Sequence, residues 1–147
     1  MNFEPSILAR LQDEVVARLK GDEYLAEIDV VGEERKDLVQ TITLGLQTLG
    51  VVIVVQTVAA NCTKPNLQGP VFDSLKFSVE VVENVLFNRA AKGTNKPALE
   101  IAVRVSQRLH HFRPAIGGGT IIIDNPSIQL AANDQNLIYD VNFKIGE

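Results

Sequence analysis

The sequence predicts a single α+β domain, in which one four-stranded, mostly antiparallel sheet carries helices packed on one face. Segments with an apolar side chain every three or four residues are interspersed with segments in which apolar and polar side chains alternate. Short polar turns join the later extended segments, which favours hairpins and antiparallel pairing. The chain has 147 residues, 46% hydrophobic and 22% charged, which fits one globular domain over residues 1–147.

The predicted order of elements is helix, helix, strand, strand, helix, strand, strand. Residues 5–20 form the first helix, because a proline suits the first helical turn and leucines and valines recur at helical spacing. Gly21 follows its last residue, as is typical of a helix end. Residues 22–31 are compatible with a short extended segment. A second helix covers about 36–49, and Gly50 ends it.

Two strands follow the second helix. Residues 51–58 are β-branched at nearly every position, and such a continuous apolar run indicates a strand buried on both faces. Residues 61–70 contain two prolines and a glycine and are predicted to be a loop. Residues 71–86 alternate between apolar and polar side chains, with Lys76, Ser78 and Glu80 on the polar side. This alternation predicts an antiparallel strand with one face in solvent.

The last third of the chain predicts a helix and a hairpin. Residues 98–112 carry an apolar stripe at helical spacing, and Pro114 ends the helix. Residues 120–124 form a strand that residues 127–131 continue beyond a kink at Asn125 and Pro126. Residues 137–145 alternate strictly and form the last strand, antiparallel to the one before.

Composition excludes several classes of function. The formal net charge of −4 argues against a sequence-specific nucleic-acid binder and against binding to an acidic membrane. No apolar run approaches the length of about 20 residues that a membrane span needs, and the first ten residues do not have the form of a signal peptide. A single cysteine, Cys62, rules out an internal disulfide and fits a reducing compartment.

No catalytic, cofactor-binding or metal-binding site is predicted. His110 and His111 are adjacent, and side chains of neighbouring helical residues diverge by about 100°, so the two rings do not easily share one ion. Cys62 lies close to Lys64 on a predicted loop. The enzymatic alternative is that Cys62 acts as a nucleophile paired with one of the two histidines. The glycine run 117–119 lacks the spacing of a phosphate-binding loop and precedes a strand. Glu80 and Glu83, three residues apart on a strand, face opposite sides and are expected to be solvent-facing or interfacial charges.

Charge is distributed unevenly along the chain. Residues 1–50 carry five basic and ten acidic side chains, whereas residues 88–113 carry six basic side chains and one acid, Glu100. Arg104 and Arg108 share one helix face. We therefore expect three arginines, Arg89, Arg104 and Arg108, to contact acidic groups of a neighbouring subunit or of another assembly partner, with a solvated helix face as the alternative.

Five local phrases, together with the order and size of the elements, resemble the phage tail terminator and tail-completion proteins, including the minor tail protein U type. They are residues 19–30, the helix end at Gly50 followed by 51–55, the strand end 79–84 followed by 88–89, the helix end 109–114, and the strand 139–143. Members of this family often have a proline after the Glu-Asn of the third phrase, where this chain has Val85.

The resemblance implies a non-enzymatic structural protein without cofactors. It implies assembly as a ring, commonly a hexamer, on the last ring of the tail tube, where the ring stops tube growth and presents a surface to head or neck proteins. The implied location is the virion tail, assembled in the cytoplasm of a bacterial host. The resemblance leaves open whether the chain is a terminator, a neck protein or a contractile-tail component. A small-ligand-binding or adaptor domain of the host cytoplasm is the alternative from another class.

Overall fold

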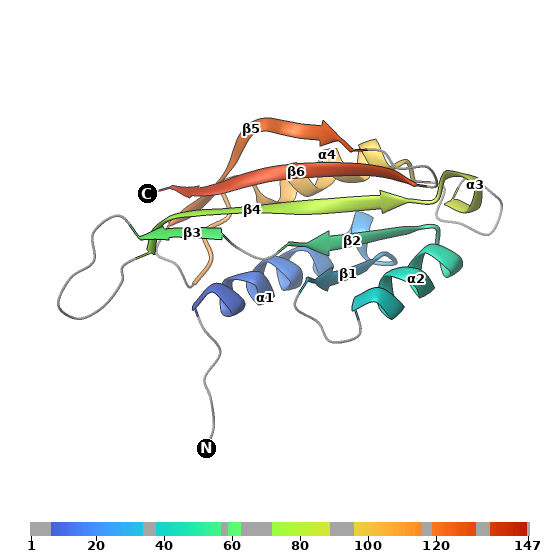
Figure 1. The fold of residues 1–147 in the computed structure, drawn as a ribbon, viewed down its shortest axis with the longest axis horizontal. Coiled ribbons are helices and arrows are strands. Elements are labelled where there is room, and N and C mark those ends of the chain that lie inside the picture. Colours follow the sequence, from blue (N-terminus) through green and yellow to red (C-terminus); the bar gives the residue numbers. More distant parts are fainter. Residues whose placement is uncertain are drawn as a thin grey trace, which may run out of the picture.

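The computed structural model describes residues 7–33, 38–56, 59–62, 72–88, 96–115, 119–131 and 136–146 (Figure 1). The helices are α1 (Ile7–Lys20), the 3-10 turn η1 (Glu23–Leu25), α2 (Leu38–Thr48), α3 (Val85–Asn88) and α4 (Ala98–Leu109). The strands are β1 (Asp29–Gly32), β2 (Val51–Val55), β3 (Ala59–Cys62), β4 (Phe72–Glu83), β5 (Thr120–Leu130) and β6 (Leu137–Gly146).

The strands form one six-stranded mixed sheet, so the prediction of a four-stranded, mostly antiparallel sheet is wrong, although the α+β class holds. The order is β1-β2-β4-β6-β5. β3 pairs with the first part of β4, on the same edge of β4 whose later part pairs with β2. β1 and β2 are parallel, with Asp29 opposite Val52, because α2 carries the chain back between them. Most of β1 lies in residues 22–31, which the sequence marks as compatible with a short extended segment, whereas β3, which overlaps the start of the predicted loop 61–70, was not predicted.

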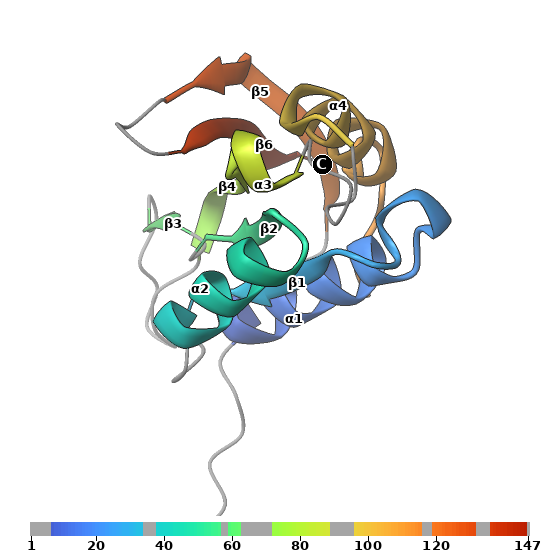
Figure 2. The ribbon, with the colours of Figure 1, turned by 90° about the vertical axis from the view of Figure 1, so that its right-hand side faces the viewer.

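Helices cover both faces of the sheet, so the prediction that they pack on one face is also wrong. α1 and α4 pack on one face and enclose the main core, whereas α2 packs on the other (Figure 2). The residues of β2 alternate between the two cores: Val51, Ile53 and Val55 join the main core, and Val52 and Val54 pack under α2. Burial of β2 on both faces, which its continuous apolar run predicted, therefore requires a helix on each side.

The long strands β4 and β6 form the centre of the sheet. They pair antiparallel from Leu75 opposite Ile145 to Glu83 opposite Leu137. The predicted hairpin of the last two strands is confirmed, and the register between β5 and β6 shifts between Ile123 and Ile128. α2 covers only the β1–β2 end of its face. The rest of that face, over β4, β6 and β5, looks toward the viewer in Figure 1, with α4 behind the sheet.

α4 begins at a buried carboxyl group of β4. Glu83 has no exposed surface, and its two carboxyl oxygens accept hydrogen bonds from the Ala98 N–H at 3.0 Å and from the Asn88 amide at 2.6 Å. Asn88 also donates to the Lys96 carbonyl. The expectation that Glu83 is a solvent-facing or interfacial charge is therefore wrong. Glu83 and Glu80 do face opposite sides of the sheet, as predicted.

α4 ends at Leu109, three residues before the predicted end. His111 adopts a left-handed conformation with φ of 68°, which turns the chain out of the helix. The His111 N–H then donates to the Ile121 carbonyl at 2.7 Å, so the turn joins α4 to the start of β5. None of the helices in the described part of the chain is long and apolar enough to cross a membrane.

Candidate functional site

Arg104 and Arg108, two of the three predicted interface arginines, surround a buried acid of their own chain. Asp22 lies between α1 and η1, and its side chain is 1% exposed. The Arg104 Nε donates to Asp22 Oδ2 at 2.8 Å, and the Arg108 Nε lies 3.9 Å from the same oxygen. Arg104 and Arg108 nevertheless remain 45% and 29% exposed. Arg89, the third, lies outside the described residues.

Arg18 of α1 completes this group, which we call the arginine cluster (Arg18, Arg104, Arg108 and Asp22). The Arg18 Nε donates to the Arg108 carbonyl at 3.3 Å, and the Arg108 Nε donates to the Arg18 carbonyl at 3.1 Å. The Arg18 guanidinium also lies 4.7 Å from the centre of the Phe112 ring, a cation–π contact. These reciprocal contacts hold α1 against α4 and fix both arginine side chains.

The carboxyl group of Asp22 is held ionised by its partners. Burial alone would raise its pKa, but the hydrogen bonds from Arg104 and from the Tyr24 N–H, with the charges of Arg104 and Arg108, outweigh burial and lower the pKa below its ordinary value. Asp22 thereby neutralises one of three guanidinium charges. The arginine cluster keeps an excess of positive charge at the surface.

A second basic contact adjoins the arginine cluster. The Lys96 Nζ lies 3.1 Å from Glu27, donates to the Tyr24 carbonyl at 2.7 Å, and sits 4.6 Å from the Tyr24 ring centre. A shallow hollow of about 240 Å³ lies between Tyr24 and the outer face of α4, lined also by Glu100, Val103, Arg104 and Gln107. The outer face of α4 and the 22–27 segment thus form one continuous polar surface.

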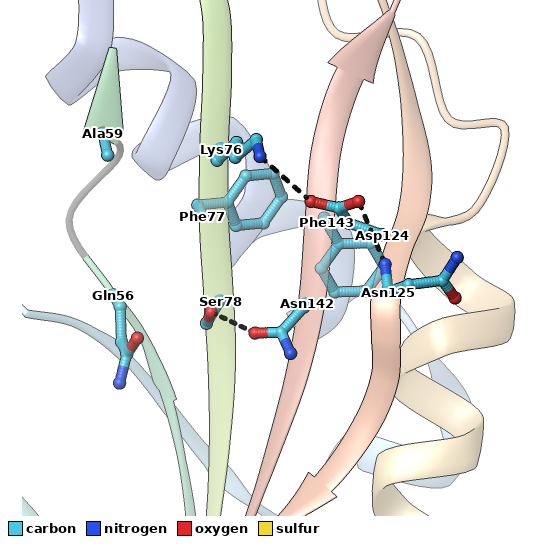
Figure 3. A pocket seen from close by; sticks show the side chains of 9 residues that line it. All are labelled: Gln56, Ala59, Lys76, Phe77, Ser78, Asp124, Asn125, Asn142 and Phe143. Carbon is cyan, nitrogen blue, oxygen red and sulfur yellow. Dashed lines mark hydrogen bonds and ion pairs between the residues drawn. The ribbon is translucent and has the colours of Figure 1, made fainter.

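The uncovered face of the sheet is the second candidate surface. Polar side chains of β4 and β6 line a hollow of about 390 Å³ there, together with Gln56, Asp124 and Asn125 (Figure 3). Ser78 donates to Asn142 at 2.6 Å across the two strands, and Lys76 lies 3.6 Å from Asp124 of β5. The predicted half-solvated alternation of β4 is confirmed by this face. These contacts pair polar side chains of neighbouring strands with one another, and the hollow that they line is shallow and open to solvent.

Two carboxyl groups lie directly opposite each other on this face. Glu80 of β4 pairs in register with Asp140 of β6. Burial raises the pKa of Glu80, the charges of Asp140 and Glu33 add to the increase, and the Gln56 amide, 3.1 Å from Glu80, opposes it. Burial also raises the pKa of Asp140, and its Oδ1 is buried without a hydrogen-bond partner in the described part of the chain. The acid pair therefore costs stability when both groups are ionised.

We expect Asp140→Asn to raise the free energy of unfolding at pH 7, by a few tenths to about 1 kcal/mol after allowance for solvent screening. Because the native pKa of each acid is raised, the pair's contribution to stability is most favourable below the ordinary carboxyl pKa of about 4 and falls as pH rises through the native pKa. The gain should therefore vanish in acid. Urea unfolding between pH 3.5 and 7 measures it.

Asp124→Asn is the matched control for this prediction, because Asp124 faces Lys76 rather than another acid. It should leave stability unchanged or slightly lower it at pH 7. If the free energy of unfolding of Asp140→Asn differed from that of the wild type by the same amount at every pH, repulsion within the acid pair would be refuted.

The remaining sequence candidates do not form a site in the described part of the chain. The rings of His110 and His111 lie 4.0 Å apart, rather than diverging, because the helix has already ended. The His110 Nδ1 accepts the Ile123 N–H, and no group of three or more histidine, cysteine, aspartate or glutamate side chains gathers among the described residues. Cys62 ends β3, and Lys64 and residues 117–118 lie outside the described residues.

Sequence reasoning missed Asp22 and Arg18 as partners of Arg104 and Arg108. The local sequence does signal Asp22 as a cap, because its carboxylate accepts the N–H of Tyr24, two residues on. Its pairing with Arg104, 82 residues away, has no local signature. The Glu80–Asp140 pair likewise depends on the register between β4 and β6, which the sequence alone does not give.

Two solved structures share this fold over nearly the whole chain. One is a chain of the virion of a native gene transfer agent particle, 16% identical over 94% of this chain and 95% of that chain, with a TM-score of 0.62. The other, whose name describes no activity, is 15% identical over 95% of this chain and 92% of that chain, with a TM-score of 0.57. No family model and no curated protein matches the sequence. At these identities the likeness establishes a shared fold.

Proposed function

We propose that the chain is a structural, non-enzymatic component of a phage-like virion, acting at the end of a tail tube as a terminator or tail-completion protein. The observation that carries the proposal is the shared fold, end to end, with a chain of a gene transfer agent virion. The local phrases that resemble the tail terminator proteins support it independently. The partners are further copies of the chain, the tail tube protein, and head or neck proteins.

The proposed assembly is a ring, with a hexamer as the expected size, formed in the cytoplasm of a bacterial host and retained in the virion tail. A ring needs two different surfaces on each subunit that complement each other. The arginine cluster, which lies between α1 and α4 and carries an excess of positive charge, is a candidate for one of these surfaces, and the uncovered polar face of β4 and β6 lies on the opposite side of the sheet. Neither resembles the enclosed apolar pocket of a small-molecule enzyme.

The test is whether the chain binds the end of a tail tube. Purified chain is added to tail tubes of the same virion, and the bound copies are counted by quantitative gel analysis and located by negative-stain microscopy. We expect closed rings at tube ends, with a number of bound copies per tube that does not depend on tube length.

Tube fractions of two different mean lengths supply the control. Binding in proportion to length would mean that the chain coats the tube wall, which contradicts a terminator. A chain that fails to bind tubes, and stays monomeric at every concentration in light scattering, would instead favour the adaptor or ligand-binding alternative.

A further inference from the structure

The arginine cluster encloses a small hollow in which positive charge exceeds negative charge. The hollow measures about 170 Å³ and is lined by Arg18, Asp22, Arg104, Gln107 and Arg108. Three guanidinium groups share it with a single carboxylate. Like charges at such proximity repel one another, and an anion in the hollow would relieve that repulsion.

The guanidinium groups are positioned by their Nε atoms, which leaves the terminal nitrogens available. Each of the three Nε atoms donates to a partner within the chain: Arg18 to the Arg108 carbonyl, Arg108 to the Arg18 carbonyl, and Arg104 to Asp22. Within the described residues, the terminal nitrogens of these arginines donate no hydrogen bond. Forked guanidinium donors whose side chains are already fixed are suited to a carboxylate, since little side-chain freedom is lost on binding.

Gly21 keeps one side of the hollow free of side-chain atoms. A Cβ added at Gly21 would lie 3.3 Å from the Arg108 Nη2. A larger residue there would press on the guanidinium group and move its donors. The glycine at the end of α1 therefore leaves room for the Arg108 guanidinium group as well as ending the helix.

Exposed acids lie along a different part of the same chain, the edge strand β1 and the part of α1 beside it. Asp29 is the first residue of β1, Glu33 directly follows its last residue, and Asp13 of α1 lines a hollow with residues 30–32 of β1. We call this group the acidic edge (Asp13, Asp29 and Glu33). A subunit that carries an electropositive hollow on one surface and an acidic edge on another is complementary to its own copy in a head-to-tail arrangement.

We propose that the arginine cluster is a docking site for a carboxylate of a second copy, supplied by its acidic edge. This deepens the proposed function, on which it rests, by naming the contact between neighbouring subunits. The terminal nitrogens of Arg18 and Arg108 bind the incoming carboxylate, and Asp22 and Arg104 keep the hollow in shape. The contact is charged and partly exposed, so salt weakens it.

The first experiment compares self-association of paired variants by light scattering over a range of concentration and salt. Arg18→Gln with Arg108→Gln removes two charges from the hollow, and Asp29→Asn with Glu33→Gln removes two from the acidic edge. We expect each pair to weaken self-association by roughly tenfold or more. Lys76→Gln with Lys144→Gln changes the net charge by the same amount on the uncovered sheet face and should have no such effect.

A thermal melt establishes that each variant is folded, and Arg18→Lys with Arg108→Lys separates charge from geometry. Because lysine keeps the charge but lacks the fork, we expect this pair to recover only part of the association. A folded Arg18→Gln, Arg108→Gln variant that associates like the wild type would overturn the proposal.

The second experiment places a photo-crosslinking amino acid at Gln107, which lines the hollow. Crosslinks between copies, formed free in solution and on tail tubes, are mapped by mass spectrometry. We expect them at residues 29–33. Crosslinks confined to other segments, or none in either setting, would overturn the docking site. A chain that still caps tail tubes in that case would leave the proposed function intact, whereas loss of tube binding by the wild type would remove the function itself.

Discussion

Glu83→Ala is expected to lower the free energy of unfolding by about 3 kcal/mol or more, because it leaves two buried donors without an acceptor. The Glu83 carboxyl oxygens accept from the Ala98 N–H and the Asn88 amide, and Glu83 has no exposed surface. The change also leaves a cavity the size of a carboxymethyl group under the start of α4. Urea unfolding followed by far-UV circular dichroism measures the loss.

Glu83→Gln is the matched control, because it keeps the volume but replaces one acceptor by a donor. One of the two contacts survives, so we expect roughly half the loss of Glu83→Ala. Glu80→Gln, three residues earlier on the exposed side of β4, should not destabilise the protein at pH 7. Equal effects at Glu83 and Glu80 would contradict the assignment of Glu83 as the group that holds the start of α4.

Alternation along the strands predicted the faces of the sheet well. The apolar side of β4 lies in the main core, and its polar side forms the uncovered face, as the pattern from Leu75 to Val81 indicated. Alternation is a local property, because successive side chains of any strand point to opposite faces. Which strands are neighbours is not local, and the sequence pattern did not supply it.

The missed parallel pairing and the assignment of all helices to one face have one origin at β1. This strand has only four residues, too few for a clear alternation, so its parallel pairing with β2 was not predicted. Without β1 there is no crossover, and no reason to place α2 on the face opposite α1 and α4. The continuous apolar run of β2 already required cover on both sides, and Val52 and Val54 under α2 satisfy that requirement.

The candidate site shows the same division between local and distant information. The helical spacing of Arg104 and Arg108 predicted that they share a face, and both do contact Asp22. What they contact within the chain could not be predicted, since Asp22 and Arg18 come from the first helix and the turn after it. The basic segment 88–113 and the acidic residues 1–50 indicated complementary charges. Which of these charges contact each other within a subunit depends on the fold.

Gly50→Ala is expected to destabilise the protein by about 3 kcal/mol or more. Gly50 adopts φ of 83°, the left-handed conformation at the end of α2, and its N–H donates to the Gly45 carbonyl at 3.1 Å. An added Cβ would lie 2.5 Å from both the backbone nitrogen and the Cα of Asn88, so the backbone at Asn88 would have to move. The alanine would also have to hold the left-handed conformation, which strains the backbone at position 50. Thermal and urea unfolding measure the loss.

Gly146→Ala is the control for this change, because a Cβ there meets only the end of the Ile122 side chain, at 3.2 Å. It should cost well under half as much. Gly50 and Glu83 are linked through Asn88, since a shift of Asn88 that makes room for the added Cβ would also weaken its hydrogen bond to Glu83. Gly50→Ala and Glu83→Ala should therefore be less than additive when combined. Full additivity would mean that the end of α2 and the start of α4 are held independently, and that Asn88 does not connect them.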